Sequence, residues 1–157
     1  MRCLAPLLAA ILTLSALPAL AGPAETAFLS KLPGEWTGSG KLTGAETGTV
    51  SCTLTLRGTD KINFSGVCDA GKFGPQNYSG VLTYDDEAKQ YLARSNGQTV
   101  VGVKSGAALV FKSKMKTVAG SGDSVMKMSA KAIVIDVDLV RADTGDRIKS
   151  HLSFAKS

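Results

Sequence analysis

The sequence contains a single histidine, His151, and only three cysteines. A Ser–His–Asp or Cys–His nucleophilic arrangement would therefore have to be assembled around one imidazole. No serine stands in a G-x-S-x-G turn, and the chain has no H-E-x-x-H pair, no Cys/His zinc spacing and no phosphate-binding glycine loop before a helix. We therefore predict no catalytic residue, no metal site, no cofactor and no enzymatic activity.

Long apolar runs are also scarce, and the one that exists lies at the start of the chain. Arg2 precedes it, residues 4–17 form it, and Ala19 and Ala21 make an A-x-A cleavage site behind it. The pattern predicts a signal peptide over residues 1–21, cleaved near Ala21. The remaining domain, residues 22–157, is then expected to be periplasmic or secreted and not membrane-spanning.

Two cysteines remain once Cys3 leaves with the predicted leader. Cys52 and Cys68 form an even pair in an exported domain, where a disulfide is the usual state. A hairpin with a three-residue loop over residues 59–61 places Leu56 opposite Phe64 and Cys52 opposite Cys68, all on the apolar face. We therefore predict a structural Cys52–Cys68 disulfide.

The charge is moderately positive, at a formal +5. The basic residues are scattered, except that Lys112, Lys114 and Lys116 recur with a spacing of two and so share one face of a strand. Such a row is typical of a solvated outer face or a protected sheet edge, and it also suits attraction to an anionic envelope surface. A nucleic-acid partner is not expected, because no patch combines basic and aromatic residues.

Helical periodicity is confined to residues 25–32, which end at Pro33 and Gly34. Beyond them, short β-type segments alternate with turn residues at residues 35–43, 47–57, 61–69, 77–84, 89–94, 98–103, 107–115, 124–130, 131–141 and 147–154. The predicted fold class is all-β: a single antiparallel up-and-down β-barrel of about 8–10 strands with a short N-terminal helix.

Apolar and polar residues alternate most clearly in the segments at residues 47–57, 131–141 and 147–154, where Leu54, Ile135 and Leu152 each share a face with other apolar residues. The same alternation turns His151 outward, with Arg147 and Lys149. From parity and size we predict a ligand cavity lined by Trp36, Leu54, Phe64, Leu109, Phe111, Ile135, Val137, Leu152 and Phe154.

The motif at the start of the first predicted strand, Gly34-Glu35-Trp36-Thr37-Gly38-Ser39-Gly40, reads G-x-W-x-G-x-G. It resembles the opening of the lipocalin-like (calycin) barrels and, in its longer form, that of the nitrobindin branch. The segments at residues 83–91 and 144–156 are similar to hairpins of bacterial exported lipocalin-like proteins of unknown function. The resemblance implies that Trp36 plugs the closed end of a barrel, with Lys156 where those proteins often place an arginine over the tryptophan. It implies a fold and no activity.

These observations favour a non-catalytic exported barrel that binds a small apolar or amphipathic ligand among its inward side chains. One alternative is an interaction protein of the cell envelope, such as an inhibitor of a secreted protease that uses residues 22–27 as a free arm. Another is a heme-binding barrel, because nitrobindin-like barrels carry a heme-ligating histidine near the chain end. The outward parity of His151 speaks against that second alternative.

The loops of ten up-and-down strands alternate between the two ends of a barrel. The loops at residues 43–46, 70–76, 95–97, 116–123 and 142–146 then lie at the end away from Trp36. Two of them are long and rich in glycine, and one carries Phe73. Long loops at one end are a usual place for recognition. We therefore predict Phe73 at the cavity mouth, with a ligand or partner engaged by Phe73 and the 116–123 loop.

Overall fold

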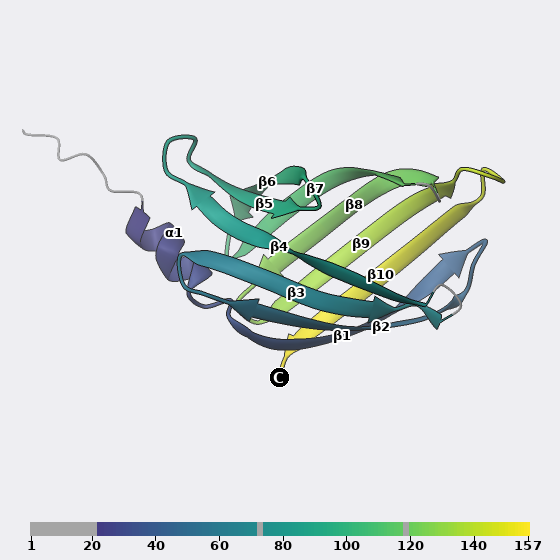
Figure 1. Ribbon diagram of the computed structural model, residues 1–157, viewed down its shortest axis with the longest axis horizontal. Coiled ribbons are helices and arrows are strands. Elements are labelled where there is room, and N and C mark those ends of the chain that lie inside the picture. The colour runs from purple at the N-terminus through teal and green to yellow at the C-terminus, as the bar shows by residue number, and fades with distance from the viewer. Residues whose placement is uncertain (1–21, 72–73, 118–119) are drawn as a thin grey trace, which may run out of the picture.

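The computed structural model describes residues 22–71, 74–117 and 120–157, which form one helix and ten strands (Figure 1). Helix α1 spans Gly22–Leu29. The strands are β1 (Gly34–Gly44), β2 (Gly48–Arg57), β3 (Lys61–Asp69), β4 (Pro75–Asp85), β5 (Gln90–Ser95), β6 (Gln98–Ser105), β7 (Ala108–Thr117), β8 (Gly120–Ser129), β9 (Ala132–Arg141) and β10 (Arg147–Lys156). Within the described residues, no helix is long and apolar enough to cross a membrane.

The ten strands form one closed antiparallel barrel. Each strand pairs with its neighbours in the chain, and β1 pairs with β10 from Trp36–Lys156 to Gly44–Ile148. The predicted all-β, up-and-down barrel with a short N-terminal helix is confirmed, at the upper end of the expected number of strands. The predicted leader, residues 1–21, and the predicted mouth residue Phe73 lie outside the described residues.

The strands form because apolar and polar residues alternate, which buries one face of the sheet. In β2, Val50, Cys52, Leu54 and Leu56 are buried, whereas most residues between them are exposed. The predicted register with β3 is confirmed, since Leu56 pairs with Phe64 and Cys52 with Cys68. The two cysteines are joined by a disulfide across the pair, with their Cα atoms 4.1 Å apart.

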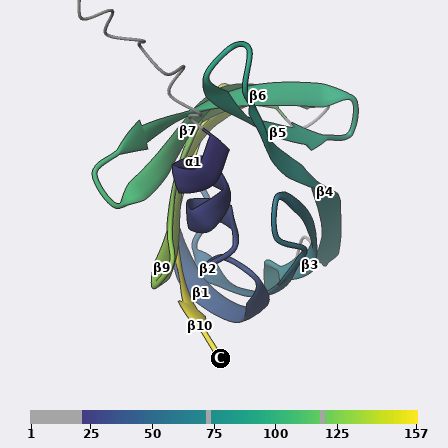
Figure 2. The same ribbon diagram turned by 90° about the vertical axis from the view of Figure 1, so that its left-hand side faces the viewer.

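One end of the barrel is closed by α1, which lies inside the ring of strands when the molecule is viewed along its length (Figure 2). Phe28, Leu29 and Leu32 are buried there. The indole Nε1 of Trp36 donates a buried hydrogen bond to the carbonyl of Leu32, at 3.1 Å. Lys156 Nζ lies 5.5 Å from the centroid of the Trp36 ring. Lys156 therefore occupies the cationic position over the tryptophan.

The helix is displaced from the predicted 25–32. It begins at Gly22 and ends at Leu29. The amides of Lys31 and Leu32 then bond to the carbonyls of Phe28 and Leu29, at 3.1 and 3.0 Å, in tight turns ahead of Pro33. The apolar residues of this segment are buried as predicted, but Leu32 reaches the core from a turn.

The predicted loop at residues 116–123 is wrong, because β7 extends to Thr117 and β8 already begins at Gly120. Two glycines made this segment look like a loop. A Cβ atom on Gly122 would lie 2.0 Å from the carbonyl oxygen of Asp138 on β9. Glycine there permits a close approach of two strands.

The wall of the barrel is incomplete between β6 and β7. β6 pairs with β7 only from Gly102–Phe111 to Ser105–Ala108, although β7 pairs with β8 along its whole length. Within the described chain, residues 98–101 of β6 and 112–116 of β7 form no ladder with each other. We call this divergence the β6–β7 fork. In Figure 1 the β5–β6 hairpin ends near the middle of the barrel, whereas β7 and β8 continue beyond it.

Candidate ligand site in the barrel interior

The half of the interior next to α1 is filled with apolar side chains. Leu109 and Ile133 are completely buried, and Phe154 is 2% exposed. Each belongs to a strand whose partners also turn apolar residues inward, as the pairing of Phe154 with Ile133 shows. This end therefore acts as a packed base.

Above the packed base lies an apolar cavity of about 130 Å³. It is lined by Leu54, Leu56, Phe64, Tyr78, Leu82, Ala93, Phe111, Met126, Met128, Ile133 and Ile135. None of these side chains carries a charge at neutral pH. A ligand held here meets aliphatic, thioether and aromatic groups.

Four of the nine predicted cavity residues line this cavity: Leu54, Phe64, Phe111 and Ile135. The structure places the others elsewhere. Trp36, Leu109, Leu152 and Phe154 are buried in the packed core beside it. Val137 is half-buried and pairs with Ser150 and Ser124, one inward row further from α1 than Ile135.

Sequence reasoning missed several lining residues, among them Tyr78, Ala93 and the two methionines of β8. Met126 and Met128 have the spacing of two that marks one face of a strand, so parity could have included them. Tyr78 and Ala93 lie in strands whose inward positions also include glycine or polar residues, so alternation gives no clear signal there.

The lining side chains of the cavity include one hydroxyl group, that of Tyr78. The Tyr78 hydroxyl donates a hydrogen bond to the carbonyl of Thr53, at 3.1 Å. Burial raises the pKa of Tyr78 to about 12. The Tyr91 ring lies nearer α1, with its centroid 4.9 Å from that of Tyr84, and burial is the main cause that raises the pKa of Tyr91 to about 12. Both phenols are neutral at physiological pH.

A row of serines follows the cavity toward the end away from α1. Ser113 pairs with Ser124, Ser124 with Val137, and Val137 with Ser150. Strand alternation turns these residues inward, next to the row of Phe111, Met126, Ile135 and Leu152. All three serines are half-buried. Hydroxyl groups therefore stand where the apolar lining ends.

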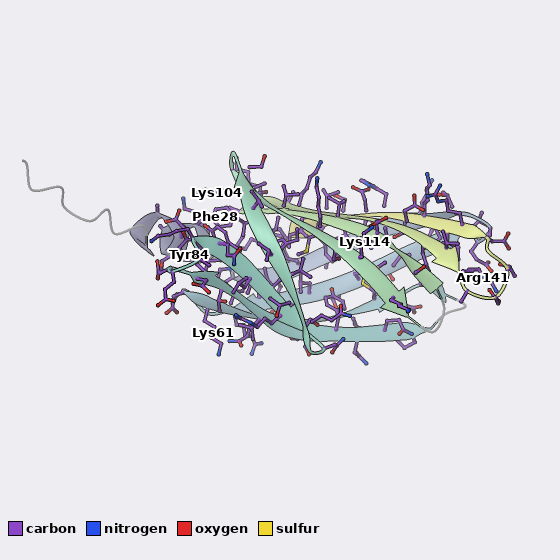
Figure 3. The ribbon with its side chains drawn as sticks, turned by 90° about the horizontal axis from the view of Figure 1, so that it is seen from above. Phe28, Lys61, Tyr84, Lys104, Lys114 and Arg141 are labelled. Carbon is purple, nitrogen blue, oxygen red and sulfur yellow. A yellow bond between two sulfur atoms is a disulfide. The ribbon has the colours of Figure 1, made fainter. Side chains whose placement is uncertain are left out.

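Ion pairs join the loops at this far end. Arg141 Nη1 contacts Glu46 Oε1 at 3.2 Å, which joins the end of β9 to the β1–β2 turn. Arg141 also pairs with Asp143, and its hydrogen bond is the largest cause that lowers the pKa of Asp143 to about 2. Figure 3 places Arg141 at the end opposite Phe28 and Tyr84.

His151 lies on the outer wall. Its Nδ1 is 2.6 Å from Asp136 Oδ1, and its side chain is 67% exposed. It borders a shallow outer groove of about 410 Å³ that also includes Lys41 and Lys149. Because His151 is the sole histidine and faces outward, the residues present do not fit a histidine-ligated heme in the interior. Among the described residues, no three His, Cys, Asp or Glu side chains gather to hold a metal ion.

No protein-family model and no curated protein sequence matches the chain. Among solved structures, the chain is similar to the S-type phycobiliprotein lyase CPES from Guillardia theta, with 10% identity, a TM-score of 0.58, and coverage of 87% of this chain and 97% of that one. It is also similar to Rv2717c from M. tuberculosis, with 13% identity, a TM-score of 0.58, and coverage of 86% and 98%. The predicted lipocalin-like barrel is thus confirmed as a fold. The specific likeness to nitrobindin stays a prediction.

The prediction that the chain is not an enzyme is corrected by the first of these similarities. A phycobiliprotein lyase is catalytic, and it has this barrel fold. The missing nucleophile elbow and metal motifs therefore do not exclude catalysis on such a barrel. Fold and chemistry are separate properties, so this similarity assigns no activity to the chain.

Proposed function

We propose that the protein is an exported barrel that binds a small, neutral, apolar or amphipathic ligand in its interior. The observation that carries the proposal is the apolar cavity of about 130 Å³ above the packed base. A dry apolar cavity of about 150 Å³ in another protein binds benzene. The size here suits a single-ring molecule, or the apolar end of a longer one that extends toward the serine row.

The absence of charge from the cavity lining limits the chemistry of the ligand. A carboxylate or ammonium placed among these side chains would lose its hydration without gaining a partner. A hydroxyl or carbonyl group at the outer end of the ligand would meet the next inward row of side chains, where it could form hydrogen bonds with Ser113, Ser124 and Ser150. These features support a ligand that is apolar at one end and uncharged but polar at the other.

The similarity to a phycobiliprotein lyase agrees with an interior used for a small molecule. Export would place this binding in the periplasm or outside the cell, after cleavage of residues 1–21. Native mass spectrometry of protein purified from an oxidising compartment would show a retained ligand as added mass, and would also report the mature N-terminus.

Binding in the cavity is tested most directly with benzene and with benzoate, its anionic counterpart. Benzene should raise the thermal midpoint of the wild-type barrel, because a ligand that binds the folded state stabilises it by mass action. Benzoate should leave the midpoint unchanged. Ala93→Leu fills the cavity wall and should abolish the benzene response, whereas Ala155→Leu, on the exposed face of β10, should retain it.

A wild-type midpoint that does not respond to benzene would contradict the proposal. So would an equal response in the Ala93→Leu variant, because the ligand would then bind elsewhere on the protein.

A further inference from the structure

The β6–β7 fork exposes hydrogen-bonding backbone on β7. Residues 112–116 pair with β8 on one side, and within the described chain they have no strand partner on the side of β6. Five residues of extended chain span roughly 17 Å. An unpaired strand edge presents N–H and C=O groups that can accept another extended chain.

The outer face of this edge is basic. Lys112, Lys114 and Lys116 alternate with the inward residues Ser113 and Met115 and are exposed. Lys114 Nζ contacts Asp123 Oδ1 on the neighbouring β8, at 3.0 Å, so the charge of Lys114 is partly balanced within the sheet. Figure 3 labels Lys114 about midway along the barrel, between Lys104 and Arg141. The three lysines therefore present a positive charge at every second residue of β7, which is the spacing of side chains on one face of a strand.

Apolar surface lies where the two strands of the fork separate. Val101 is 45% exposed and Val103 is 65% exposed. Together with Ser105, Val110 and Lys112 they line an outer groove of about 370 Å³. If the lysines served only to keep other strands from pairing with this edge, there would be no reason for exposed valines beside them. This combination of free edge, alternating cations and apolar groove is typical of a surface that accepts a chain.

We propose that the β6–β7 fork binds an extended acidic peptide segment, which adds to the edge of β7 as a further strand. Acidic side chains at alternate positions face Lys112 and Lys116, and the residues between them turn toward Ser113 and Met115 inside the fork. The segment therefore carries Asp or Glu at every second position, with small or apolar residues between. The net charge of the chain, +5 over the full sequence and positive also without Arg2 of the predicted leader, favours encounter with such a partner.

A second copy of this chain is disfavoured as the occupant by the same lysines. Pairing two β7 edges would set one row of cations against another, and like charges that face each other across strands are destabilising. An acidic strand would instead set carboxylates against the lysines, and opposite charges that face each other across strands are stabilising. Charge complementarity therefore selects the peptide.

The proposal is tested by fluorescence anisotropy at low salt, with a labelled peptide of about nine residues in which Asp and Val alternate. The peptide should bind saturably, and the same peptide with Lys in place of Asp should not. The double variant Lys112→Glu/Lys116→Glu should weaken binding by about tenfold or more. The matched control Lys41→Glu/Lys61→Glu makes the same change in net charge on exposed lysines of β1 and β3, away from the fork, and should stay within about twofold of wild type.

A peptide N-methylated at alternate residues separates strand addition from charge attraction, because it keeps the carboxylates but loses backbone donors. Its affinity should fall by about tenfold or more when the methylated edge faces β7. Equal binding of the methylated and unmethylated peptides in both registers, equal binding to the two double variants, or no binding of the acidic peptide would each overturn the proposal. A concentration-dependent dimer in analytical ultracentrifugation that the acidic peptide does not dissociate would also overturn it.

Discussion

At the scale of the residue, the half-buried Tyr78 of the cavity wall and the buried Tyr91 nearer α1 make the stability of the barrel depend on pH. Tyr78 holds its proton more tightly when folded, because burial raises its pKa to about 12 from an ordinary value near 10. Tyr91 behaves in the same way, and the negative charge of Glu25 adds to the effect of burial. The stability that these phenols contribute is complete below about pH 10 and is lost as the pH rises toward 12.

We expect the urea midpoint of the wild-type protein to fall between pH 10 and 12, and to fall less steeply in Tyr78→Phe. The variant should lose about 1 kcal/mol at neutral pH, where its hydrogen bond to the Thr53 carbonyl is missing. Urea unfolding followed by circular dichroism at several pH values measures both effects. Identical pH slopes for the variant and the wild type would show that Tyr78 does not carry this dependence.

Individual site residues were predictable where alternation is regular. Leu54, Phe111 and Ile135 follow clear period-two patterns, and all three line the cavity. Val137 follows the same pattern but lies one row nearer the far end. Parity assigns a face and not a depth, because depth depends on how the strands tilt around the barrel. Trp36 and Phe154 were predicted as inward for the same reason, and they belong to the packed base.

At the scale of the element, the Cys52–Cys68 disulfide holds the β2–β3 hairpin in register. The bridge has a sequence separation of 16 and joins residues that pair directly across the two strands. Cys52 is buried, so its loss also opens the core wall. The bridge therefore restrains the unfolded chain and covers part of the interior.

The double variant Cys52→Ala/Cys68→Ala should lower the free energy of unfolding by about 3 kcal/mol, the value that chain entropy gives for a loop of this size. Chemical denaturation under non-reducing conditions measures the difference. Dithiothreitol should destabilise the wild type toward the variant and leave the variant unchanged. A reductant effect of equal size on both proteins would contradict this role for the bridge.

The helix and strands were predictable from the sequence where apolar and polar side chains alternate regularly. The β2–β3 register was predicted correctly, because a short turn and an apolar row fix it together. β8 was predicted to start at Ser124 rather than Gly120, since Gly120 and Gly122 carry no apolar side chain to alternate. The reason for Gly122, a close approach of β9, is a tertiary fact with no local signature.

At the scale of the whole molecule, the barrel is built unevenly. The end with α1 is packed, the middle encloses the cavity, and the wall divides at the β6–β7 fork. The fold class and most of the turns followed from the sequence, the predicted loop at residues 116–123 being the exception. The fork did not, because the length of a ladder depends on where two strands begin to diverge in space.

Amide hydrogen exchange followed by NMR should reproduce this unevenness. Amides of β1 and β10 in their shared ladder should be strongly protected, because both edges of each strand are paired. About every second amide of residues 98–101 and 112–116 should exchange rapidly, since it points into the fork. Uniform protection along β7 would contradict the divergence of the two strands.

The pairing of β1 with β10 governs when the barrel can close during synthesis. The first strand waits for the last one, so a ribosome must deliver Arg147–Lys156 before β1 gains its second neighbour. Until then the strands that have formed make an open sheet with two unpaired edges. Closure of the barrel therefore cannot precede the synthesis of β10, however early the other nine strands are made.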